Sequence, residues 1–376
     1  MSSGITITQA IDLGKATLES FEQDEFQVAL KHQCYEVLNQ WFKKDRVVLD
    51  GGDRVTRYIS LRDTGNASQV RMYETDTPNV ANVDEVIRVD WTHAQVSFSY
   101  SVKEIAMNKG NKVRIYNLLK QRRTNAFREF ADLLEELAWR TPTGSGDDRN
   151  PFGIPAWLVQ DNSNDSDTGD FVGTTGNNWN ATDSTFNPGS ITVSESTNPR
   201  WANYYADHGA NLDDSMLKKL RRAFRKTNFQ SPMFAKQAID PDSSFSKFRL
   251  YTNSVVLDEL EEIATKSDDR LGADLGKYCG AVIFKGIPFI YVNVLDDDSS
   301  FSTQQGLVHG GDPIFGVNHN HFYPVVLDGE YFRVNDPMTK VGQHNVLTVY
   351  VDLSYAYICD NRRTGGFLIS DYANGG

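Results

Sequence analysis

Three histidines near the C-terminal end are the residues whose type and spacing could bind a metal ion. His319 and His321 stand two residues apart in the stretch GVNHNHFYP, and His309 precedes them in VHGGDP, close to Asp312. In a strand, residues i and i+2 point to the same side, so both imidazoles could ligate one ion. A catalytic zinc site needs a third protein ligand, which His309 or Asp312 could supply.

A histidine pair of this kind is a weak signal by itself, because two strand histidines on a wet face are the commoner case. We therefore predict no metal site, no cofactor and no catalytic residue. The alternative from another class is a metal-dependent or carbohydrate-active enzyme that uses His309, His319 and His321.

The acidic residues and the cysteines likewise show no pattern that is typical of a catalytic or metal site. The aspartates at 296–298 lack the ligand spacing of an EF-hand loop. Paired carboxylates at 261–262 and 268–269 have no reason in the sequence to be buried, and no GxSxG, P-loop, GxGxxG or HExxH motif occurs. The three cysteines are scattered and odd in number, which argues against a zinc cluster or a disulfide framework: Cys34, Cys279 and Cys359. We predict that the protein is not an enzyme.

Composition narrows the class further. The net charge of −12 argues against tight nucleic-acid binding as the main task, since that requires a clustered basic surface. No window approaches the roughly 20 apolar residues of a membrane span, and the start MSSGITITQA does not resemble a secretory signal. We expect no membrane partner and a reducing compartment.

Two strand-like runs follow an N-terminal segment that becomes helical between residues 24 and 42. They cover 54–62 and 86–102. In the second run the apolar residues alternate on odd positions up to Trp91 and on even positions from Ala94, which predicts a bulge or a change in which face is covered. Fully extended, that run would reach about 55 Å, so it needs a neighbouring surface such as another subunit.

The clearest element is a helix over 111–140, about 45 Å long. Helical spacing also predicts helices over 212–227 and 255–266, and alternation predicts a hairpin over 280–295. Between residues 322 and 360 the sequence predicts strands separated by turns that contain glycine and aspartate. The apolar stripe of the long helix is predicted to contain Ile115, Leu119, Ala126, Phe130, Leu133, Leu134 and Leu137.

The order of these elements resembles the major capsid proteins of tailed double-stranded DNA bacteriophages, whose fold is shared with encapsulin shells and the herpesvirus capsid floor. The resemblance covers nearly the whole chain. It is carried by RNPFGIPAWLV (149–159), RWANYY (200–205), the passage from the helix into TNFQSP (227–232), GAVIFKGIPFIYV (280–292), DPIFGVN (312–318) and DNRRTGGFLI (360–369).

The resemblance implies an α+β fold with an N-terminal arm, an extended β-hairpin loop, a long spine helix, and peripheral and axial domains. The arm would be 1–44 and the extended loop 45–107. The peripheral domain would be 108–150 and 310–355, and the axial domain 151–309 and 356–376. His319 and His321 would then be polar positions on a long structural strand, able to titrate near pH 6.5 and affect subunit contacts.

The function implied is that of a structural major capsid protein, which self-assembles as hexamers and pentamers into an icosahedral shell around the phage double-stranded DNA genome. Because only about 45 residues precede the loop, we expect no long assembly leader and a separate scaffolding protein. Further expected partners are a portal, a possible decoration protein and packaged DNA in non-specific contact. The expected location is the virion, after assembly in the bacterial host cytoplasm. An encapsulin-like nanocompartment shell is the nearest alternative.

Overall fold

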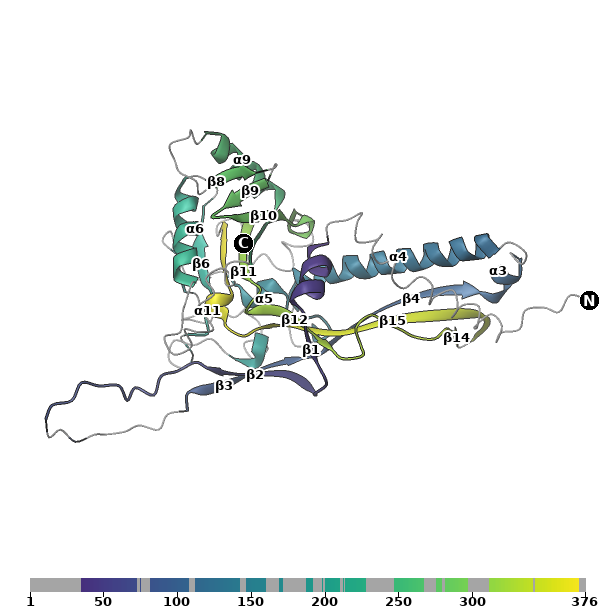
Figure 1. Ribbon diagram of the computed structural model, residues 1–376, viewed down its shortest axis with the longest axis horizontal. Helices are drawn as coiled ribbons and strands as arrows, with labels where there is room; N and C mark the ends of the chain where they lie inside the picture. Colours follow the sequence, from purple (N-terminus) through teal and green to yellow (C-terminus); the bar gives the residue numbers. More distant parts are fainter. Residues whose placement is uncertain are drawn as a thin grey trace, which may run out of the picture. The chain divides into compact units, whose positions relative to one another are not determined.

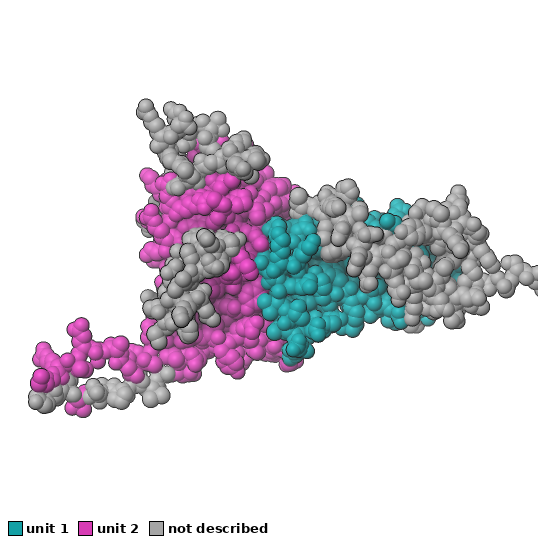
Figure 2. All heavy atoms as spheres, viewed as in Figure 1, with its two compact units in different colours: residues 1–52, 91–137, 324–355 teal, residues 53–90, 138–323, 356–376 magenta. Residues whose placement is uncertain are grey.

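The computed structural model describes the larger part of the chain and groups it into two compact units (Figure 2). Unit 1 comprises Met1–Gly52, Trp91–Leu137 and Pro324–Tyr355, and unit 2 comprises Asp53–Asp90, Ala138–Tyr323 and Ala356–Gly376. The residues described are 35–72, 75, 82–107, 112–142, 147–159, 169–171, 187–191, 198, 200–209, 212, 214–227, 247–266, 275–278, 281–296, 311–340 and 342–371. Most of the predicted N-terminal arm lies outside them.

A six-stranded sheet underlies unit 1, and its central strand β15 is 17 residues long. β12 and β13 flank β15 along the main path of the sheet, while β4 and β14 also pair with it. β1 pairs in parallel with β12 through Val47 and Val325. The strands are β1 (Val47–Leu49), β4 (Thr92–Ser101), β12 (Phe322–Leu327), β13 (Arg333–Val334), β14 (Met338–Lys340) and β15 (Gln343–Cys359).

The predicted change of face near Thr92 is a change of pairing partner. β3 (Asp84–Asp90) pairs with β2 (Arg54–Ser60), whereas β4 pairs with β15 from Thr92↔Tyr355 to Ser101↔Val346. Trp91 lies between the two strands and donates from its indole nitrogen to the Gly52 carbonyl at 2.9 Å. The even positions of β4 are buried from Thr92 to Tyr100 except at the half-buried Val96, as the alternation predicts.

The long predicted helix is present as α4 (Lys112–Ala138), drawn beside β4 and β15 in Figure 1. Its stripe is buried at Leu119, Ala126, Phe130 and Leu134. Leu133 is 38% exposed, so its inclusion in the predicted stripe is wrong. The short helix α3 (Val102–Met107) connects to α4 through a bidentate ion pair, in which Arg122 donates to both Glu104 oxygens at 2.9 and 3.0 Å.

The segment before β1 forms a π-helix, η1 (Val37–Asp45), which buries Trp41 and Phe42 completely. It is tied to the last turns of α4, where the Tyr35 hydroxyl donates to Asp132 at 2.5 Å and the Val37 amide donates to Glu135 at 3.0 Å. Those carboxylates therefore hold the start of the described chain on the long helix. No helix among the described residues is long and apolar enough to cross a membrane.

Unit 2 is built on an eight-stranded mixed sheet with the order β5-β6-β16-β11-β7-β10-β9-β8. β11 lies in the middle, antiparallel to both β16 and β7. The strands are β5 (Asp170–Phe171), β6 (Tyr204–Asp207), β7 (Phe248–Thr252), β8 (Leu275–Tyr278), β9 (Ala281–Phe284), β10 (Ile287–Tyr291), β11 (Gly311–Asn318) and β16 (Gly366–Asp371).

Two amphipathic helices pack on this sheet, as their spacing predicts. α6 (Asp214–Thr227) contacts β6 and β16, and α9 (Ser254–Lys266) contacts β8 to β11. Phe224 of α6 is at the centre of the core, with its ring 5.2 Å from that of Phe367 and 5.0 Å from that of Phe248. The remaining short elements are α5 (Ile154–Trp157), η3 (Pro188–Ser190), η4 (Asn293–Asp296) and α11 (Arg362–Gly365).

Candidate functional surface

The histidine pair lies in a turn, so its predicted place on a strand is wrong. Residues 319–321 connect β11 to β12, and the Asn318 side chain accepts a hydrogen bond from the Asn320 amide at 3.1 Å. This local bond offers the backbone an alternative to the ladder and ends the strand. His319 is only 2% exposed, and its Nε2 lies 2.9 Å from the Tyr251 hydroxyl. The imidazole therefore belongs to the core of unit 2.

Burial also overturns the expectation that these histidines titrate near pH 6.5. Desolvation, followed by the charge of Arg249, holds the pKa of His319 well below 6.5. Desolvation likewise lowers the pKa of His321, against the opposing effect of Asp360. Both imidazoles are neutral at neutral pH.

The third candidate, His309, lies outside the described residues. The Asp312 carboxylate accepts from the Asn253 side chain at 2.7 Å. Within the described part of the chain, no group of three or more histidine, cysteine or acidic residues is arranged to hold a metal ion. Cys359 is a buried free thiol, and burial raises its pKa to about 12, which suits a core residue.

The β2–β3 hairpin presents the most exposed apolar side chains of the described chain. One face of the hairpin buries Val55, Ile87 and Val89, and β3 contacts η3. The opposite side of β2 and the segment after it are open, with Tyr58 83% exposed, Val70 60% and Met72 85%. Figure 1 shows the segment beyond β2 continuing away from the sheet of unit 2. Large exposed apolar residues gathered on one projection are typical of a protein-binding surface.

Polar contacts hold the base of the loop between β2 and β3, where the chain leaves β2, against the rest of unit 2. Arg62, just after β2, donates to Glu85 at 3.1 Å and to Asn198 at 3.0 Å. Arg200 forms a bidentate pair with Asp63, and the guanidinium lowers the pKa of that carboxyl. The base of the loop is thus held in place, whereas Val70 and Met72 further along it are exposed.

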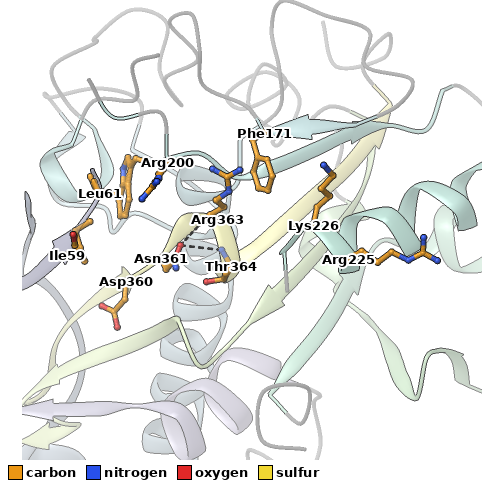
Figure 3. Close-up of a pocket in the computed structure, with 12 residues that line it drawn as sticks. Ile59, Leu61, Phe171, Arg200, Arg225, Lys226, Asp360, Asn361, Arg363 and Thr364 are labelled. Carbon is orange, nitrogen blue, oxygen red and sulfur yellow. Dashed lines mark hydrogen bonds between the residues drawn. The ribbon is translucent and has the colours of Figure 1, made fainter. Parts of the chain in front are cut away.

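A pocket of about 820 Å³ opens beside this base (Figure 3). Its walls come from the end of β2, from β5, from the end of α6 and from the segment that includes α11. Four of the lining side chains are cationic: Arg200, Arg225, Lys226 and Arg363. None of them was a predicted site residue, because they come from three distant parts of the sequence.

A buried network supports the floor of the pocket. Asn203 is fully buried, and its amide donates to the Val159 carbonyl at 2.8 Å while its oxygen accepts from the Val159 amide at 3.2 Å. The same oxygen accepts from Arg362 at 3.3 Å, and Arg362 also donates to the Trp157 carbonyl at 2.8 Å. These bonds join two segments that carried the resemblance, 149–159 and 200–205, to α11.

Comparison with known proteins finds relatives only at the level of structure. No protein-family model and no curated protein sequence matches the chain. A chain in the cyanophage A-1(L) capsid asymmetric unit matches with a TM-score of 0.56 at 12% identity, covering 87% of this chain and 90% of that one. A chain in the capsid of Myoviridae phage XM1 matches with a TM-score of 0.47 at 10% identity, covering 91% and 97%.

The first of these matches carries the fold assignment, since it exceeds a TM-score of 0.5 across most of both chains. It agrees with the mixed helix and sheet content predicted from the sequence. The chain therefore has the α+β fold of phage major capsid proteins.

Proposed function

We propose that this protein is the major structural subunit of a phage capsid, assembling as hexamers and pentamers into an icosahedral shell around double-stranded DNA. The single observation that supports this most strongly is the match to a phage capsid chain over 87% of the length. The burial of His319 supports a structural role for the segment that the enzyme alternative would use. We assign no catalytic role to any residue.

The exposed hairpin supplies the contact surface that a shell requires. Tyr58, Val70 and Met72 are left uncovered by the unit that carries them. Burial of apolar surface stabilises an interface by about 25 cal/mol per Å², and many copies would repeat the same contact. Heterologous contacts of this kind close into rings and shells when the rotation between neighbours permits it.

The remaining assignments belong to the same proposal. They comprise the arm at 1–44, the loop at 45–107, the peripheral domain at 108–150 and 310–355, and the axial domain at 151–309 and 356–376. A separate scaffolding protein, a portal, a possible decoration protein and packaged DNA are the proposed partners. The proposed location is the virion, after assembly in the host cytoplasm.

Substitution of Tyr58 tests whether the hairpin is an intersubunit surface. Tyr58→Asp places a charge on an apolar contact, whereas Tyr58→Phe keeps the ring and serves as the matched control. We expect Tyr58→Phe to form shells like the wild type and Tyr58→Asp to stay as small oligomers, measured by sedimentation velocity on protein co-expressed with its scaffold. Equal assembly of both variants would remove the hairpin from the interface, and a wild type that stays monomeric would count against the shell itself.

A further inference from the structure

The pocket at the end of β2, where the loop to β3 begins, concentrates positive charge in a chain whose net charge is −12. Arg363 stands at its centre, and the guanidinium carbon lies 3.8 Å from the centroid of the Phe171 ring. Figure 3 shows Arg200 and Arg363 together beside Phe171, with Lys226 at the end of α6 and Arg225 pointing outward from the same helix. The cations therefore line one opening, with Arg225 at its rim.

Within the part of the chain that the structure describes, most of this charge has no carboxylate paired with it. Arg200 is paired with Asp63. Arg363, Arg225 and Lys226 form no ion pair with any described residue.

The acidic groups near the pocket do not neutralise Arg363. The carboxylate in the pocket wall, Asp360, accepts from the Tyr323 hydroxyl at 2.7 Å and points away from Arg363 in Figure 3. Burial, and secondarily the charge of Arg200, lowers the pKa of Arg363, and these effects outweigh the opposing charge of Asp170. An added anion would therefore be attracted to this guanidinium.

We propose that this pocket binds the phosphate groups of a nucleic-acid strand. Three unpaired cations match the repeated charges of a phosphate backbone better than the single charge of one carboxylate, and arginine presents the planar fork of donors that phosphate oxygens fit. The Phe171 ring lies against the Arg363 guanidinium and so keeps this cation at the pocket.

The choice of nucleic acid as the source of phosphate rests on the proposed function, in which the shell encloses a genome. The phosphate chemistry rests on the pocket alone. Binding is expected to be weak for each copy and salt-dependent, because it uses few cations and follows counterion release. This agrees with an acidic protein whose main task is not nucleic-acid binding.

Fluorescence anisotropy of a labelled 12-base-pair DNA duplex with the purified full-length chain tests the proposal. Lys226→Glu is the test variant, and Lys218→Glu is its matched control, because Lys218 is an exposed residue of the same helix that does not line the pocket. We expect Lys226→Glu to weaken binding about tenfold at low salt and to reduce the slope of log affinity against log salt by about 0.9 for each phosphate that the variant no longer neutralises. Lys218→Glu should stay within about twofold of the wild type, since its charge lies outside the pocket.

Further arms separate the sources of the anion. Inorganic phosphate that competes at millimolar concentration in the wild type, but not in Lys226→Glu, supports a phosphate site. Equal weakening by Lys226→Glu and Lys218→Glu would mean general electrostatic attraction and would overturn the proposal. So would stronger binding of the acidic peptide QDNSNDSDT, residues 160–168, than of the oligonucleotide. Arg363→Lys provides a second variant that keeps the charge and loses the planar fork, and it should weaken phosphate competition.

Shell formation is scored separately by electron microscopy of the same variants. If Lys226→Glu assembles normally but does not bind the oligonucleotide, the pocket acts in binding and is not needed for shell formation. Wild-type protein that binds the oligonucleotide through Lys226 without assembling would leave the phosphate site standing and count against the capsid function.

Discussion

Removal of the Asn203 side chain is expected to destabilise unit 2 by an amount that can be worked out bond by bond. Asn203→Ala leaves three buried groups without their partner: the amide and the carbonyl of Val159, and the Arg362 guanidinium. Each buried group left unsatisfied costs about 1–3 kcal/mol, and a charged one costs more. Allowing for partial relaxation, the expected loss in the free energy of unfolding is about 4 kcal/mol.

Asn203→Asp is the matched control for this prediction. The aspartate keeps an acceptor for the Val159 amide and for Arg362, and loses the donor that the Val159 and Tyr204 carbonyls share. It should therefore cost about 1–2 kcal/mol.

Urea denaturation followed by tryptophan fluorescence measures both variants, because Trp157 and Trp201 lie next to the network with ring centroids 6.3 Å apart. A loss below about 1 kcal/mol for Asn203→Ala, or equal losses for both variants, would refute the bond-by-bond reasoning.

Three further predictions concern single side chains. Folding lowers the pKa of His319, so the unfolded chain takes up the proton first and the protein loses stability as the pH falls below 6.5. Between pH 6.5 and 5.5 the free energy of unfolding of the wild type, measured by urea titration, should fall by about 1 kcal/mol more than that of His319→Gln. Equal falls for the two proteins would contradict this. Leu134→Ala should lower the free energy of unfolding by about 2–5 kcal/mol and Leu133→Ala by less than about 1 kcal/mol, because only Leu134 is fully buried. Similar losses for both variants, in thermal or urea unfolding, would mean that the buried face of α4 is not the one described. A Cβ at Gly153 would lie 2.2 Å from the Arg140 carbonyl oxygen, so Gly153→Ala should lower the melting temperature clearly, at a cost of about 1–3 kcal/mol, and an unchanged melting temperature would be evidence against this packing.

Periodicity predicted the elements well wherever one face of an element is covered. The phase change at Thr92 marks the point where β3, which pairs with β2, gives way to β4, which pairs with β15. The shift between odd and even positions therefore reflects a change of pairing partner. The stripe of α4 was predicted one residue too wide at Leu133, because spacing alone does not say how much of a helix its neighbours cover.

The functional surface was less accessible to sequence reasoning. His319 was placed on a strand because of its spacing from His321 and because of the resemblance, whereas the Asn318 side chain closes a turn that no glycine or proline marks. The pocket combines Arg200, Lys226 and Arg363, which only the sheet order brings together. The segment DNRRTGGFLI contributed to the resemblance, but nothing in its composition distinguishes the buried Arg362 from Arg363 at the pocket.

Cryo-electron microscopy of the full-length chain, expressed together with its scaffolding protein, would show whether this chain builds a capsid. We predict closed shells of uniform diameter in which hexamers and pentamers of this chain form the wall, with the β2–β3 hairpin of one copy in contact with a neighbour. A homogeneous population of small particles containing one or two copies, obtained with the scaffold present and the chain folded, would contradict it.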